Sequence, residues 1–74
     1  MNKPNLKPVP FYHCDITVDE VTLPLLQTMN AEDRFSIDRF KVQGNQAIMV
    51  LNRNEIGMLR KFGLKVEVKQ VLFL

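Results

Sequence analysis

Apolar and polar residues alternate in three stretches of the chain, and each stretch predicts β-structure. Residues 11–18 alternate once, residues 35–51 contain two alternating runs, and residues 64–69 alternate again. In the first stretch, one side of the strand carries only apolar or aromatic residues together with the cysteine, namely Tyr12, Cys14, Ile16 and Val18. Such a strand is typical of a sheet that buries one face and leaves the other uncovered.

The two runs within residues 35–51 flank Gly44–Asn45, which suits the two-residue loop of a type I′ or II′ hairpin. This loop predicts the register, with three opposed pairs: Val42 with Ala47, Phe40 with Met49, and Asp38 with Leu51. One face then carries Phe40, Val42, Ala47, Met49 and Leu51. The other face carries Arg39, Lys41, Ile48 and Val50.

A short helix is expected between the first strand and the hairpin, and its start is ambiguous. The sequence Thr17-Val-Asp-Glu20 has the form of a capping box, but a helix beginning there would place Pro24 in its interior at a cost of about 3 kcal/mol. We therefore favour a helix over 23–30 with Thr22 as its N-cap, which puts Pro24 in the first turn. Its apolar face would hold Leu25, Leu26 and Met29, and Asn30 would close it.

A second helix is expected to begin after Asn52. Asn52 is a good N-cap and Glu55 occupies the capping-box position three residues later. Gly63 fits the residue that follows the helix. Gly57 lies inside the helix, where it predicts a close approach to the sheet. The expected apolar stripe consists of Ile56, Leu59 and Phe62.

The elements follow the order β-α-β-β-α-β, which is the ferredoxin-like plan of the α+β class. It predicts a four-stranded antiparallel sheet with two helices on one face. Residues 1–10 contain three prolines and are expected to form an extended lead-in. Residues 11–74 would form a single α+β domain.

Composition narrows the function classes. The chain has 74 residues, a net charge of +2 and one cysteine, so no internal disulfide is possible. The first ten residues lack the apolar core of a signal peptide, and no apolar run reaches the ~20 residues of a membrane span. A single free thiol without an export signal predicts the reducing cytoplasm.

Residues 37–51 and 54–68 combine a hairpin, a helix that opens with an acidic residue, and an ending in which Leu59 precedes Gly63 and an alternating strand. In this combination the chain resembles the ferredoxin-like segments that precede some zinc carboxypeptidases. Those propeptides mask a protease active site and assist its folding. The resemblance implies the same fold, and it implies an inhibitor of an enzyme as one alternative function.

Few residues suggest chemistry. His13 and Asp15 flank Cys14, but adjacent strand residues point to opposite faces, so the three cannot converge. The carboxylate pairs Asp19–Glu20 and Glu32–Asp33 are expected at element ends. Gly44–Asn45 lacks the lysine and flanking glycines of a phosphate loop. We predict no catalytic residue, no cofactor and no metal site, and hence no enzyme.

The outer face of the sheet predicts an interaction module instead. Apolar residues there would be exposed in a monomer, and contiguous apolar patches mark contact surfaces. The favoured partner is a protein, with a homodimer preferred, and no membrane is expected. The candidate interface residues are Phe11, His13, Ile48, Val50, Val71, Leu72, Phe73 and Leu74. The alternative is a weak nucleic-acid binder that uses Arg39, Lys41 and neighbouring basic residues.

Overall fold

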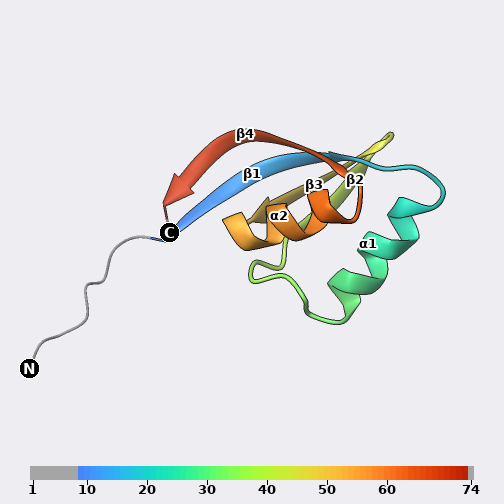
Figure 1. The fold of residues 1–74 in the computed structure, drawn as a ribbon, viewed down its shortest axis with the longest axis horizontal. Coiled ribbons are helices and arrows are strands. Elements are labelled where there is room, and N and C mark those ends of the chain that lie inside the picture. The colour runs from blue at the N-terminus through green and yellow to red at the C-terminus, as the bar shows by residue number, and fades with distance from the viewer. Residues whose placement is uncertain (1–8, 74) are drawn as a thin grey trace, which may run out of the picture.

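The computed structural model describes residues 9–73, so most of the predicted lead-in over residues 1–10, and Leu74, lie outside it. Within residues 9–73 the chain forms four strands and two helices in the expected order (Figure 1). The elements are β1 Pro10–Thr17, α1 Thr22–Ala31, β2 Phe40–Gln43, β3 Gln46–Leu51, α2 Arg53–Lys61 and β4 Lys65–Phe73.

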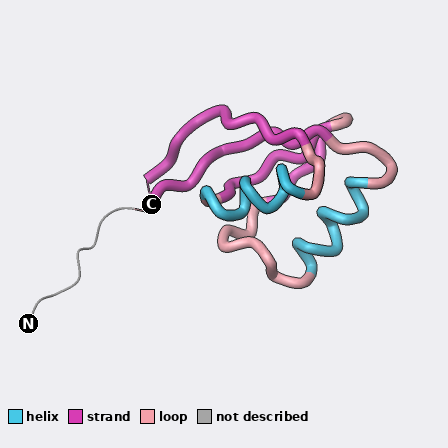
Figure 2. The backbone as a smooth tube through the Cα atoms, in the orientation of Figure 1, coloured by secondary structure: helices cyan, strands magenta, loops and turns pink. Residues whose placement is uncertain are grey.

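The strands form one antiparallel sheet in the order β2-β3-β1-β4. Both helices lie on the same side of this sheet, as the tube trace in Figure 2 also shows. This arrangement is the ferredoxin-like fold, and it confirms the predicted fold class. The central strands are β3 and β1, and the edges are the short β2 and the nine-residue β4.

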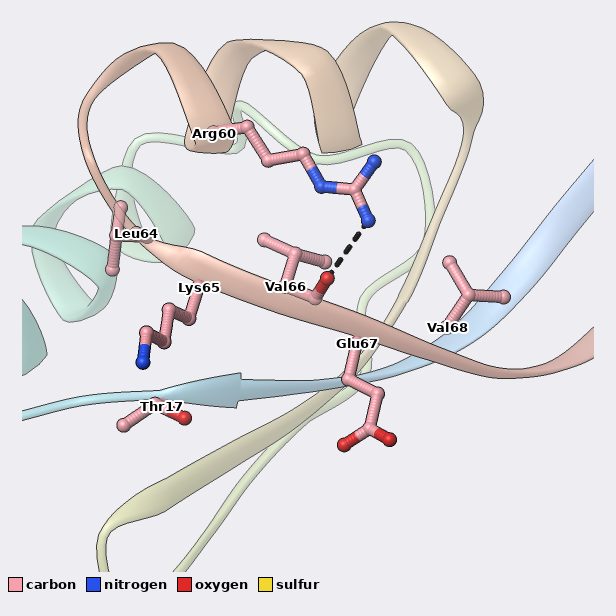
Figure 3. Close-up of a pocket in the computed structure, with 7 residues that line it drawn as sticks. All are labelled: Thr17, Arg60, Leu64, Lys65, Val66, Glu67 and Val68. Atoms are coloured by element: carbon pink, nitrogen blue, oxygen red, sulfur yellow. Dashed lines mark hydrogen bonds between the residues drawn. The ribbon is translucent and has the colours of Figure 1, made fainter.

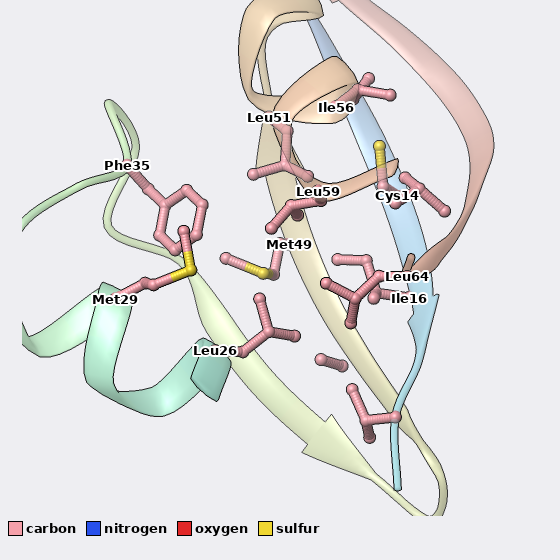
Figure 4. Close-up of a cluster of buried hydrophobic side chains, with 13 residues drawn as sticks. Cys14, Ile16, Leu26, Met29, Phe35, Met49, Leu51, Ile56, Leu59 and Leu64 are labelled. Carbon is pink, nitrogen blue, oxygen red and sulfur yellow. The ribbon is translucent and has the colours of Figure 1, made fainter. Parts of the chain in front are cut away.

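The core fills the space between the sheet and the helices (Figure 4). Alternate residues of β1 and β3 point into it, and Cys14, Ile16 and Leu51 are fully buried. Leu26 and Leu59 meet them from α1 and α2 and are fully buried as well. The predicted apolar sides of β1 and β3 are therefore the core side of the sheet.

The hairpin has the predicted two-residue loop and register. Phe40 pairs with Met49 and Val42 with Ala47. Gly44 has a φ of 61°, whereas Asn45 is not among the residues with positive φ, so the turn belongs to type II′. The Asn45 carbonyl also accepts the Val18 N–H at 2.8 Å, which ties the turn to the end of β1.

The first hairpin strand is shorter than predicted. β2 begins at Phe40, so Asp38 does not pair with Leu51, and residues 35–39 form a loop. Phe35 is buried in the core, and the Ser36 N–H donates to a carboxylate oxygen of Glu55 at 2.7 Å. These contacts hold the loop against the helices, so it does not extend the sheet. Val42, predicted to be inside, lies on the edge strand β2 and is 40% exposed.

Helix α1 begins near the favoured position, but the expected cap was wrong. Asp19, and not Thr22, accepts the free N–H groups of Val21 and Thr22, at 2.9 and 2.8 Å. The Thr22 hydroxyl accepts the Asp19 N–H in return. Pro24 is the third residue of α1, and the Leu23 N–H just before it donates to the Asp19 carbonyl at 3.0 Å.

The apolar face of α1 is narrower than expected. Leu26 and Met29 are buried, whereas Leu25 is 40% exposed because it points away from the core. The helix continues past Asn30 to Ala31. It closes at Asp33, which has a φ of 56°, and a backbone hydrogen bond from Arg34 to Met29 completes a Schellman motif.

Helix α2 has the predicted capping box. Asn52 Oδ1 accepts the Glu55 N–H at 2.8 Å, and Glu55 accepts the Asn52 N–H at 2.9 Å. The helix closes at Gly63, which has a φ of 91°. The expected apolar stripe was wrong at Phe62, which is 58% exposed because this C-cap residue turns away from the core.

The expected reason for Gly57 was also wrong. A Cβ built at this position would have no neighbour within 4 Å beyond its own helix turn. Gly57 lies on the exposed side of α2, so no close approach to the sheet requires it.

Strand β4 is longer than the predicted 64–69, because the apolar end of the chain continues the strand to Phe73. The pairing with β1 shifts between His13 and Cys14, which pair with Gln70 and Val68. Lys69 is therefore the extra residue of a β-bulge. The bulge accounts for the break in alternation. Because it inserts one extra residue, the residues after it point to the side of the sheet opposite to the one that unbroken alternation would give.

Candidate interaction surface

The side of the sheet opposite the helices is the surface that the sequence singled out, and we call it the open face. The helices α1 and α2 bury their apolar residues on the other side. Strand alternation and the observed registers assign the members of the open face. They are Phe11, His13, Asp15, Thr17, Lys41, Gln43, Gln46, Ile48, Val50, Lys65, Glu67, Gln70 and Leu72.

Three apolar side chains of the open face are half-buried, namely Phe11, Ile48 and Leu72. Val50 differs from the expectation, because only 5% of its surface is exposed although it lies outside the core cluster. It lies on a central strand and pairs with His13 of β1. Val50 is therefore the floor of the open face and leaves little surface for a partner.

A hollow of about 350 Å³ surrounds this floor. Its apolar lining includes Ile48, Val50 and Leu72. The basic residues Arg39 and Lys41 line the same hollow, as does His13. The structure thus brings together four of the eight predicted interface residues and both predicted nucleic-acid contacts. The hollow itself was not predicted, because one of its lining residues, Leu72, reaches the open face through the bulge.

Charges of both signs occupy the open face in one row across the sheet. Ile48 pairs with Lys41 of β2 on one side and with Asp15 of β1 on the other. Glu67 of β4 pairs with Asp15 and extends the acidic end of the row. Figure 3 shows Glu67 pointing away from helix α2, whereas Val66 points toward it. This row is therefore basic at β2, apolar at β3 and acidic at β1 and β4. Elsewhere on β4, Lys65 lies on the same face and Lys69 pairs with Glu67 at 3.7 Å.

The apolar C-terminal residues divide between the two sides of the sheet. Leu72 pairs with Phe11 and belongs to the open face. Val71 pairs with Tyr12 on the helix side, where it is 48% exposed, and Phe73 is 66% exposed. The predicted contact residues Val71 and Phe73 thus do not share the open face with Leu72, and Leu74 lies outside the described residues.

The edge of the sheet at β4 is partly covered. Arg60 of α2 donates from Nη2 to the Val66 carbonyl at 2.8 Å (Figure 3). This carbonyl points outward from the sheet, and an unpaired carbonyl at an edge is a template for another strand. Arg60 therefore blocks strand addition at this part of β4.

His13 and Cys14 lie on opposite sides of β1, as the alternation predicts. His13 faces the hollow, whereas Cys14 is fully buried in the core and its Sγ donates to the Tyr12 carbonyl at 3.4 Å. Burial raises the pKa of the Cys14 thiol from 9.0 to about 11, although the positive charge of Arg60 opposes this shift. A buried thiol with so high a pKa is a poor nucleophile at neutral pH.

Carboxylates at the element ends have structural partners. Hydrogen bonds from the N–H groups of Thr22 and Val21 lower the pKa of Asp19. Glu32 pairs with Arg34 at 2.9 Å. Glu55 is 7% exposed and accepts from both Asn52 and Ser36. Sequence reasoning found the capping box of Glu55 but missed Ser36, because 19 residues separate them.

Within residues 9–73, no three histidine, cysteine or acidic side chains gather as metal ligands would. In the same part of the chain, neither helix has the length and apolar character needed to cross a membrane. No protein-family model, curated protein or solved structure matches the chain.

Proposed function

We propose that this chain is a small, non-enzymatic interaction module that binds a protein through its open face, and that its preferred partner is a second copy of itself. The observation that carries this proposal is the position of Phe11, Ile48 and Leu72. These apolar side chains are half-buried on the side away from the helices, where Ile48 and Leu72 line the hollow and Phe11 pairs with Leu72. Contiguous apolar surface of this kind is typical of contact sites.

The open face is a better contact surface for a protein partner than the edge of the sheet at β4. Arg60 occupies the outward carbonyl of Val66, so a strand added there would first have to displace the guanidinium. The open face requires no such rearrangement. A second copy would also bury additional apolar surface. A 74-residue chain without an internal disulfide has a small core, so it gains stability from such burial.

An inhibitor of a larger enzyme, as the propeptide resemblance implies, is another form of the same module and would use the same face. We retain the cytoplasm as the proposed location, because the single cysteine is a buried free thiol and gains nothing from an oxidising compartment.

Binding of nucleic acid remains the second candidate, since His13, Arg39 and Lys41 line one hollow. Asp15 and Glu67 lie on the same face and would repel phosphate groups. Retention of RNA or DNA at about 50 mM salt, lost as salt increases, would favour this candidate over the protein partner.

Sedimentation over a range of concentrations tests the proposed self-association. We expect the purified chain to form dimers as its concentration rises, and Ile48→Lys to shift it to monomers, because a charge would replace apolar surface at the centre of the contact. The control is Val42→Lys, which places the same charge on the same hairpin but on the helix side. A chain that stays monomeric, or dimers that tolerate Ile48→Lys, would refute self-association through the open face.

A further inference from the structure

The row of Lys41, Ile48 and Asp15 across three strands identifies how two copies would meet. We infer that the chain pairs through its open face around a twofold axis along β3, so that Lys41 of each copy contacts the partner's Asp15. This inference rests on the proposed function and adds the arrangement of the two copies. Its basis is the pairing of Ile48 with Lys41 on one side and with Asp15 on the other.

The geometry of stacked sheets permits these contacts. Neighbouring strands lie about 4.8 Å apart, so Lys41 and Asp15 are separated by roughly 10 Å, with Ile48 midway between them. Two sheets that pack face to face are also about 10 Å apart, a gap that side chains from both sheets fill. A lysine and an aspartate that face each other across this gap can therefore meet.

A twofold axis along β3 reverses the order of the strands in the partner. Strand β3 then lies over the partner's β3, and β2 lies over the partner's β1. Ile48 meets the partner's Ile48 at the axis, and each Lys41 faces the partner's Asp15. The contact between Lys41 and the partner's Asp15 thus occurs twice, once on each side of the axis, as in any isologous interface.

Other twofold arrangements are less favourable in charge. An axis across the strands would place β2 over the partner's β2 and bring Arg39 and Lys41 close to the same residues of the partner. An axis between β3 and β1 would place Ile48 over the partner's Asp15 and leave that carboxylate without a cation. Lys41 would then face the partner's Glu67, a carboxylate that already pairs with Lys69 at 3.7 Å. Charge complementarity sets the orientation of partners more strongly than it sets affinity, so it selects the axis along β3.

Both charged residues can be exchanged without disturbing the core. Lys41 is exposed, Asp15 is half-buried on the open face, and neither makes a salt bridge among the described residues. The substitution Lys41→Asp would place a carboxylate against the partner's Asp15. The substitution Asp15→Lys would place two lysines in contact. A mixture of the two variants would restore both opposite-charge contacts in a heterodimer.

The test is sedimentation equilibrium of each variant alone and of their equimolar mixture, with circular dichroism to verify folding. We expect each variant alone to dissociate at least about tenfold more readily than the natural chain. The mixture should recover dimers to within a few-fold of the natural chain. Lys61→Asp, on the exposed side of α2, is the matched control and should leave association unchanged.

The outcomes separate this arrangement from the proposed function. A mixture that associates no better than the single variants would overturn the Lys41–Asp15 contact. If Ile48→Lys still dissociates the dimer in that case, the open face remains the interface and only the arrangement is wrong. A natural chain that is monomeric at every concentration overturns both.

Discussion

At the scale of single residues, the buried side chains with polar or titratable groups all serve the fold. Glu55 joins the start of α2 to the loop before β2 through Asn52 and Ser36. Cys14 fills the core beneath α2, and its thiol finds an acceptor in the Tyr12 carbonyl. These groups have hydrogen-bond partners within the chain, so among the described residues no buried side-chain nitrogen or oxygen lacks a partner.

The raised pKa of Cys14 predicts a stability that depends on pH. The folded pKa of about 11 exceeds the ordinary value of 9.0, so folding favours the protonated thiol. This contribution to the free energy of unfolding is fully present below pH 9 and is lost as the pH rises from 9 to 11.

Denaturant unfolding of the natural chain and of Cys14→Ala between pH 7 and 11 measures this effect. Other groups also titrate in this range, and the difference between the two proteins isolates Cys14. We expect the difference in unfolding free energy to shift against the natural chain above pH 9. A difference that stays constant to pH 11 would show that the thiol does not titrate with a raised pKa.

At the scale of elements, caps and turns account for the positions of the helices and strands. Both helices end in Schellman motifs, one at Asp33 and the other at Gly63. The bulge at Lys69 moves Leu72 to the open face and Val71 to the helix side. The bulge therefore decides to which side of the sheet each apolar residue at the end of β4 points.

One residue of helix α2, Gly57, can be replaced by a residue that favours the helix more strongly. Gly57 is exposed and has open space where a side chain would begin. We expect Gly57→Ala to raise the free energy of unfolding by about 1 kcal/mol, because alanine restricts the unfolded chain and favours the helix. That increase corresponds to a rise in Tm of roughly 4–8 °C for a domain of this size.

The matched comparison is Gly63→Ala, at the glycine that ends the same helix. Gly63 has a φ of 91°, which an alanine adopts only with strain, so this variant should unfold more easily. Thermal unfolding of both variants provides the measurement. A lower Tm for Gly57→Ala would mean that the glycine serves a contact outside the folded monomer.

At the scale of the whole molecule, one side of the sheet is covered by helices and the other presents a polarised, partly apolar surface. A dimer stabilises each copy by mass action, so its stability depends on concentration. We expect Tm of the natural chain to rise with protein concentration and Tm of Ile48→Lys to stay constant. Calorimetry over a wide range of concentration measures both, and a natural chain with a constant Tm would contradict self-association.

Local patterns were enough to predict much of this architecture. Alternation, the Gly44–Asn45 turn and the Asn52–Glu55 capping box depend on neighbouring residues, and they predicted the order of elements, the hairpin register and the start of α2. The same reasoning identified Ile48 and Leu72 as candidate contact residues. It was less accurate at Leu25 and Phe62, because helical spacing alone does not show how wide the covered face is.

The sequence by itself determined the fold class, since strand and helix periodicities are properties of adjacent residues. Only the tertiary structure decided that Val50 is buried, that Leu72 joins the open face and that Ile48 lies between Lys41 and Asp15. Those outcomes depend on the pairing of β1 with β3 and β4, which brings together residues that lie far apart along the chain. Contacts over such separations follow from the packing of the whole chain and leave no periodic signal in the sequence.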